Sequence, residues 1–248
     1  MIDDIDRKDD DNEKIRETEM ENIEEESIEV EITQEHQTDP VDAYWKAQAG
    51  ILKSSFVNTS IIIITIIAFL YSQIAGDAFV SKFEQRSEYV AAGRELYRLI
   101  TSMFLHADLE HLFSNMLILF FVGANAEHDI GHIPYLILYF FAGIAGNLLS
   151  TAYDLHIGEF IPSIGASGAV FGVIGAVAII VLFGRKNLRR GSNLIIRLAF
   201  MIILSVYSGF TADNIDNAAH IGGLLGGALF TLIITLIMKK EYTMEEWL

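Results

Sequence analysis

Six apolar stretches recur along the chain, and each is long enough, or nearly so, to cross a membrane. They run over residues 56–76, 109–127, 132–152, 167–184, 193–210 and 217–238. A helix needs about 20 residues to cross the hydrocarbon core of a bilayer. The pattern predicts an all-α membrane protein, a bundle of six transmembrane helices over 56–240. An interfacial segment at 41–55 precedes it, and a short cytosolic tail at 241–248 follows.

The amino-terminal 40 residues have a different character from the rest. They hold 17 acidic and four basic residues, whereas the whole chain is 52% hydrophobic with three prolines. A segment this charged and this poor in aromatics cannot bury enough surface to offset its ordering entropy. We therefore expect residues 1–40 to form a disordered acidic tail, which argues against binding to nucleic acid or anionic lipid. We also expect no cleavable signal peptide, because the first 30 residues lack an apolar region behind a basic one.

Basic residues flank the apolar stretches unequally. With the amino terminus inside, the inner flanks carry Lys46, Lys53, Arg185, Lys186, Arg189, Arg190, Lys239 and Lys240. The outer flanks carry Lys82, Arg86, Arg94 and Arg98. This excess of inner positive charge favours cytoplasmic amino and carboxyl termini. All four outer bases lie in the segment 76–106, which is long for a connector, and we expect it to contain structure of its own.

Four polar side chains stand in or beside the apolar stretches and need a reason, because polar groups inside a bilayer are costly. They are His111, Asn115, Ser167 and His220. Each has a plain explanation when taken alone: a serine often caps a helix, and a histidine or asparagine often forms a hydrogen bond between helices. Asp216 is expected only to cap the last helix. The chain has no cysteine, which excludes thiolate catalysis and disulfides.

Depth in the membrane links three of these side chains. The inner helix ends are placed at His128–Asp129, Arg185–Lys186 and Lys239–Lys240. At 1.5 Å per residue, Ser167, His220 and His111 then lie about 27, 28 and 26 Å from those ends. All three helices run from outside to inside, so the polar groups share one level just below the outer boundary. A serine, a histidine base and a His–Asn pair of donors are the parts of an acyl-transfer site.

Small residues offer a way to bring these helices together. Gly168 and Gly172 are four apart on one stretch, and Ala219, Gly223 and Gly227 are spaced by four on the last. Rows of this kind let helix backbones approach closely in membranes. We expect this approach to bring His220 near Ser167.

These motifs resemble those of the rhomboid family of intramembrane serine proteases, over roughly residues 94–230. "GASG" is similar to the family's nucleophile motif at Ser167, and "AHIGG" to its base motif at His220. "HADLEHLFSNM" resembles the signature that gives oxyanion-stabilising roles to His111 and Asn115. The resemblance further assigns a structural acid, the arginine of a W-R pair and an aromatic beside the base. These fall on Glu127, on Arg98 after Tyr97, and on Phe171.

The resemblance implies a serine endopeptidase that cleaves transmembrane proteins with small residues and a locally unstable helix near the outer face. Ser167 and His220 would form a catalytic dyad, with no cofactor and no metal. One alternative is a metalloprotease that uses His106, His111 and His220, although their spacing is not that of H-E-x-x-H. Another is a rhomboid-like, non-catalytic protein that binds membrane segments. The short loops and compact core favour a prokaryotic plasma membrane.

Overall fold

The computed structural model describes residues 40–183, 203 and 215–238, and the secondary structure there is helical apart from one isolated bridge between Gln85 and Ser163. The helices are α2 (Pro40–Ser54), α3 (Phe56–Ala75), α4 (Asp77–Phe83), α5 (Ser87–Ala91), α6 (Arg98–Thr101), η1 (Ser102–Phe104), α7 (Leu109–Ile118), η2 (Leu119–Gly123), α8 (Ala124–Ile130), α9 (His132–Ile157), α10 (Ser167–Phe183) and α12 (Asn217–Met238). Residues 1–39 of the predicted acidic tail, the fifth predicted span at 193–210 except residue 203, and the tail at 241–248 lie outside the described residues.

Within the described ranges, four helices are long and apolar enough to cross a membrane. They are Phe56–Ala75, Leu109–Ile130, His132–Ile157 and Asn217–Ile237, and α10 is a shorter apolar helix of 17 residues. The all-helical prediction is confirmed, and four of the six predicted spans match these candidates. The third helix continues to Ile157 rather than ending near 152, because the buried Asp154 is satisfied by a hydrogen bond from Ser87 Oγ.

The second span is a composite of three elements. A π-helical turn, η2, joins α7 to α8, and the helix ends at Ile130 before Gly131, whose φ is 92°. The end therefore lies three residues beyond the predicted 127. Glu127 itself is fully buried, and its carboxylate accepts the backbone N–H groups of Val57 and Asn58 at the start of α3. Glu127 thus satisfies two of the amide donors that a helix start leaves open.

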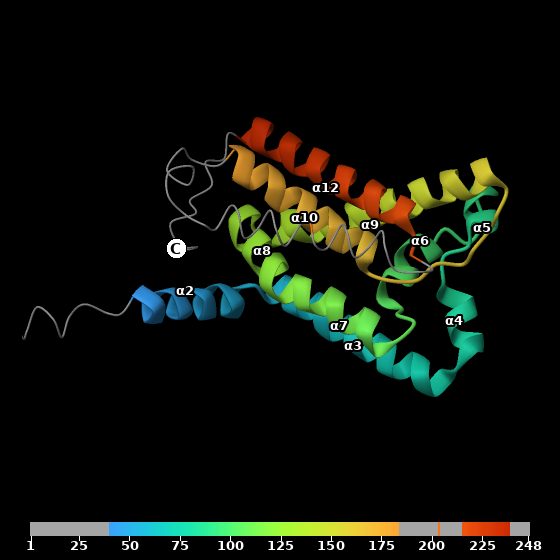
Figure 1. Cartoon of the computed structure of the whole chain (residues 1–248), viewed down its shortest axis with the longest axis horizontal. Coiled ribbons are helices and arrows are strands. Elements are labelled where there is room, and N and C mark those ends of the chain that lie inside the picture. The colour runs from blue at the N-terminus through green and yellow to red at the C-terminus, as the bar shows by residue number, and fades with distance from the viewer. Residues whose placement is uncertain (1–39, 184–202, 204–214, 239–248) are drawn as a thin grey trace, which may run out of the picture. The chain divides into compact units, whose positions relative to one another are not determined.

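Helices α9, α10 and α12 pack against one another (Figure 1), and α9 and α10 supply much of the buried apolar core. The packing of α10 against α12 depends on glycine. A Cβ atom on Gly223 would overlap the carbonyl oxygen of Gly168, and one on Gly227 would overlap that of Gly172. The predicted rows of small residues therefore do allow the two backbones to meet.

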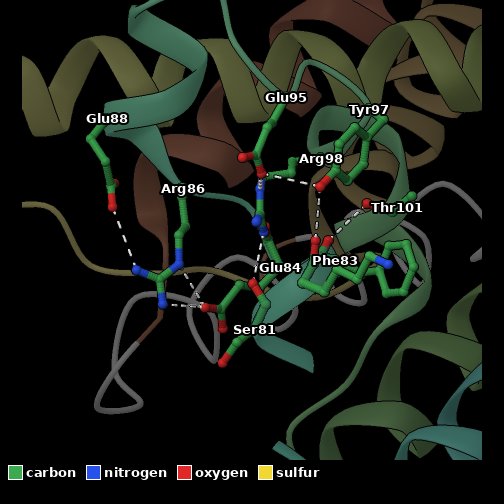
Figure 2. A network of polar contacts seen from close by, with 10 residues as sticks. Ser81, Phe83, Glu84, Arg86, Glu88, Glu95, Tyr97, Arg98 and Thr101 are labelled. Atoms are coloured by element: carbon green, nitrogen blue, oxygen red, sulfur yellow. Dashed lines mark hydrogen bonds and ion pairs between the residues drawn. The ribbon is translucent and has the colours of Figure 1, made fainter. Parts of the chain in front are cut away.

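The segment between the first two spans contains α4, α5, α6 and η1, which confirms that it has structure of its own. Arg98 organises it: the guanidinium lies between Glu95 Oε2 (2.7 Å) and the backbone oxygens of Ser81 (2.9 Å) and Glu84 (2.7 Å), as Figure 2 shows. The hydrogen bond from Arg98 lowers the pKa of the Glu95 carboxyl below its ordinary value. The neighbouring Tyr97 donates its hydroxyl to Lys82 O at 3.2 Å.

Candidate functional site

Ser167 is the first residue of α10 and is half-buried. The chain enters the helix through Gly165, whose φ of 141° disfavours any residue with a side chain. A Cβ atom at Gly165 would lie 2.8 Å from His111 Cε1 and 3.6 Å from Ser167 Oγ. The glycine therefore leaves open a space that both the serine hydroxyl and the His111 imidazole border.

His220 lies in the first turn of α12 and is 5% exposed. Its ring stacks on Phe171, with the ring centroids 4.2 Å apart and the planes 10° from parallel. Phe171 stands one turn after Ser167 on α10. The backbones also meet at this level, since a Cβ on Gly168 would lie 3.4 Å from Ala219 O. Ser167 and His220 are therefore neighbours across the α10–α12 contact.

The serine and the histidine are adjacent without being bonded. In the part of the chain that the structure describes, no hydrogen bond joins Ser167 Oγ to His220, and His220 Nδ1 is buried without a hydrogen-bonding partner. Catalytic hydrogen bonds are often long before substrate binds. The imidazole is thus held by ring stacking and by its backbone, and among the described residues no carboxylate forms a hydrogen bond with the ring.

The donors expected on the second span lie beside the same site. Asp108 caps α7 by accepting the backbone N–H of His111 at 2.7 Å. Asn115 is 5% exposed, and its amide nitrogen donates to His111 O at 3.0 Å and lies 3.3 Å from His106 Nε2. An oxyanion would have to compete with one of these two contacts for an Asn115 N–H.

His106 lies beside His111 and Asn115, although the sequence analysis named it only as a possible metal ligand. Its ring meets the His111 ring edge to face at 4.9 Å, and its Nε2 accepts the backbone N–H of Ala166 at 3.5 Å. Burial, with a smaller contribution from His111, lowers the pKa of His106 from 6.5 to about 3. His106 is therefore a neutral acceptor at physiological pH. The sequence signal that could have placed His106 beside the site is its position five residues before His111, just before the start of α7.

Asp216 is the residue before α12, and the predicted cap is confirmed. Its Oδ1 accepts the backbone N–H of Ala219 at 2.8 Å, and its backbone oxygen accepts that of His220 at 3.2 Å. These are the bonds of an N-cap residue. The other carboxylate oxygen, Oδ2, accepts a hydrogen bond from Ser150 Oγ on α9 at 2.5 Å.

The described residues contain no set of side chains arranged to bind a metal ion. Across 40–183 and 215–238 no group of three His, Cys, Asp or Glu side chains is arranged to hold a metal ion. The polar groups that do converge are a hydroxyl, three imidazoles and a primary amide. That set supplies a nucleophile, a base and hydrogen-bond donors, which is the inventory needed for acyl transfer.

Comparison with known proteins gives a consistent result. The family model of the Rhomboid domain matches residues 93–237. Over 147 residues, 58% of this chain and 27% of the relative, the sequence is 39% identical to Rhomboid protease GluP of Bacillus subtilis (strain 168). It is 36% identical over 152 residues to the same organism's Putative rhomboid protease YdcA, covering 60% of this chain and 72% of that protein. RHOMBOID-like protein 2 of Arabidopsis thaliana is 37% identical over 149 residues, which cover 60% of this chain and 45% of that protein.

Proposed function

Because this chain belongs to the rhomboid family of intramembrane proteases, we propose that it is an active serine endopeptidase. It would hydrolyse peptide bonds in or next to the transmembrane segments of other membrane proteins. Its apolar helices identify it as an integral membrane protein. The proposed setting is a prokaryotic plasma membrane, with both termini in the cytoplasm. The matched region spans only about a quarter of GluP.

The proposed chemistry is acyl transfer in two steps. His220 removes the proton of Ser167, and the serine oxygen attacks the scissile carbonyl to give an acyl-enzyme, which water then releases. His220 returns the proton to the leaving amine in the first step. The oxyanion is held by the backbone N–H of Ser167 and by the side chains of His111 and Asn115.

The observation that carries the proposal is the stacking of the His220 ring on Phe171, one turn from Ser167. This contact brings the imidazole of α12 to the serine end of α10, where Gly165 also admits the His111 ring. A site that only packed helices together would not require a serine, two histidines and an asparagine to meet at one level. The depth agreement expected from the sequence supports the same interpretation.

Two other functions make different predictions. A metalloprotease using His106, His111 and His220 would be inhibited by a chelator and restored by zinc. A non-catalytic rhomboid-like protein, an alternative that the RHOMBOID-like names of the plant relatives leave open, would be expected to lack Ser167 or His220, and this chain has both.

The test is labelling with a fluorophosphonate, which reacts with activated serines. Purified protein should be labelled at Ser167, located by peptide mass, and EDTA should leave the labelling rate unchanged. His220→Ala should remain folded and lose labelling. Equal labelling of wild type and Ser167→Ala would show that the activated nucleophile lies elsewhere.

A further inference from the structure

His220 lacks the hydrogen-bonded orienting group that many catalytic histidines have. Its Nδ1 makes no hydrogen bond to any described residue, and its ring is restrained on one face by Phe171. The placement of the imidazole therefore depends on where the first turn of α12 lies. Whatever fixes that turn to the rest of the bundle also fixes the base.

Asp216 makes this connection. Its Oδ1 accepts the N–H of Ala219, the residue before His220, and its backbone oxygen accepts the N–H of His220 itself. Its Oδ2 accepts the hydroxyl of Ser150, which is 3% exposed on α9. One carboxylate thus joins the turn that carries His220 to a second helix.

Close backbone contacts between α9 and α12 accompany this hydrogen bond. On α9, Gly146 lies one turn before Ser150, and a Cβ on Gly146 would lie 2.6 Å from Ala219 O. Further along the same pair of helices, a Cβ on Gly222 would lie 2.8 Å from Ala145 O. Helices α9 and α12 therefore run antiparallel in close contact. The hydrogen bond between Ser150 and Asp216 lies at the amino-terminal end of α12, beside the turn that carries His220.

We propose that Asp216 is a positioning residue for His220, acting through the cap on α12 and the hydrogen bond from Ser150. The inference rests on the proposed proteolytic function of Ser167 and His220. Without the carboxylate, the first turn of α12 loses both its side-chain cap and its hydrogen bond to Ser150 on α9. A displacement of about 1 Å at a catalytic group can cost on the order of 100-fold in rate.

Three variants distinguish the effect of Asp216 on the position of His220 from the effect of its negative charge and from a general loss of stability. Asp216→Ala removes both contacts and should lower kcat by roughly 10- to 100-fold with little change in KM. Asp216→Asn keeps an oxygen that can accept the Ala219 N–H, and asparagine is a good N-cap, so it should recover most of kcat. Ser150→Ala leaves the cap in place and should give a smaller loss of kcat. It also keeps the test valid if Asp216→Ala fails to fold.

Ser87→Ala is the matched control. Ser87 Oγ donates to Asp154 Oδ2 at 2.6 Å and accepts from Gln85 Nε2 at 3.1 Å, so its loss also removes a buried Ser–Asp hydrogen bond to α9, and neither contact involves α12. Ser87→Ala should lower thermal stability at least as much as Ser150→Ala and leave kcat unchanged. A general loss of packing would instead lower kcat in both variants in proportion to stability.

The experiment measures kcat, KM and thermal stability in detergent, with a fluorogenic single-span peptide that has small residues near one end of its span. Wild type and Ser167→Ala are assayed beside the four variants. The proposal predicts loss in Asp216→Ala and Ser150→Ala, recovery in Asp216→Asn, and wild-type kcat in Ser87→Ala. An active wild type with unchanged kcat in both Asp216→Ala and Ser150→Ala overturns the positioning role alone. A wild type no more active than Ser167→Ala overturns the proposed function, and the positioning role with it.

Discussion

Gly223 is the position at which packing and proposed chemistry are most directly linked. A Cβ atom there would overlap Gly168 O and lie 2.7 Å from Gly168 C and 3.1 Å from Gly168 Cα. Carbon atoms pack best about 3.5–4.0 Å apart, so even alanine forces α10 and α12 to separate by roughly 1 Å. The atoms in the way are backbone, and Gly168 directly follows Ser167, so no side chain can move aside to absorb the strain.

We expect Gly223→Ala to fold with a free energy of unfolding lower by about 1–3 kcal/mol, the usual cost of overpacking. Its kcat should fall on the order of 100-fold, because Ser167 and His220 move apart. Gly223→Val should be worse on both counts. The assay is kcat and thermal stability on the same preparation.

Two controls separate this effect from substitution in general. A Cβ atom on Gly50, in α2, would meet no other atom within 4 Å, so Gly50→Ala should leave kcat unchanged and should not lower stability. Leu225 on α12 is 61% exposed, so Leu225→Ala tests the opposite face of the same helix and should leave kcat unchanged. Normal rate and stability in Gly223→Ala would refute the close α10–α12 contact.

Three further predictions concern single side chains, two of them beside the site and one at the start of α3. Asn115→Ala should lower kcat by about 10²–10³-fold, the scale of one lost oxyanion donor, with less effect on KM; an unchanged kcat would leave Asn115 as a link between His106 and the backbone. The folded-state pKa of His106 is lowered to about 3. Between pH 6.5 and that value the unfolded chain binds a proton at His106 that the folded chain does not, so the contribution of His106 to stability falls as the pH falls through this range. His106→Gln should therefore lose less stability than wild type between about pH 7 and pH 5, by about 2 kcal/mol, and parallel melting curves would contradict this. Glu127→Ala strands two backbone N–H groups at the start of α3 and should lower the free energy of unfolding by about 2–4 kcal/mol, whereas a melting temperature equal to that of wild type would show that other groups satisfy them.

The features that could be predicted from the sequence are those that follow from the regular geometry of a single helix. Helical rise placed Ser167, His111 and His220 at one depth, and the spacing of four between Gly223 and Gly227 predicted the face that meets α10. Both inferences need only the geometry of a single helix. Helix ends were less accessible, because Asp154 has the sequence character of a surface residue, and only the fold brings Ser87 close enough to donate to it.

Contacts between distant segments could not be inferred in the same way. The bond between Ser150 and Asp216 joins residues 66 apart in sequence, and each taken alone is a common helix residue. The π-helical turn at Leu119–Gly123 has no local sequence signal that we recognise. Arg98 was assigned by resemblance, but its binding of two backbone carbonyls of the segment that includes α4 depends on tertiary structure.

The most direct measurement is cleavage of a purified transmembrane substrate by wild type beside Ser167→Ala and His220→Ala, with all three shown to be folded by thermal melting. Ser167→Ala removes a single oxygen and should leave stability nearly unchanged, whereas His220→Ala also removes a buried ring stacked on Phe171 and should lower the melting temperature while the protein remains folded. If Ser167 and His220 form the catalytic dyad, wild type cleaves within or next to the membrane segment and both variants lose cleavage. Cleavage by either variant at the wild-type rate would contradict the proposed dyad.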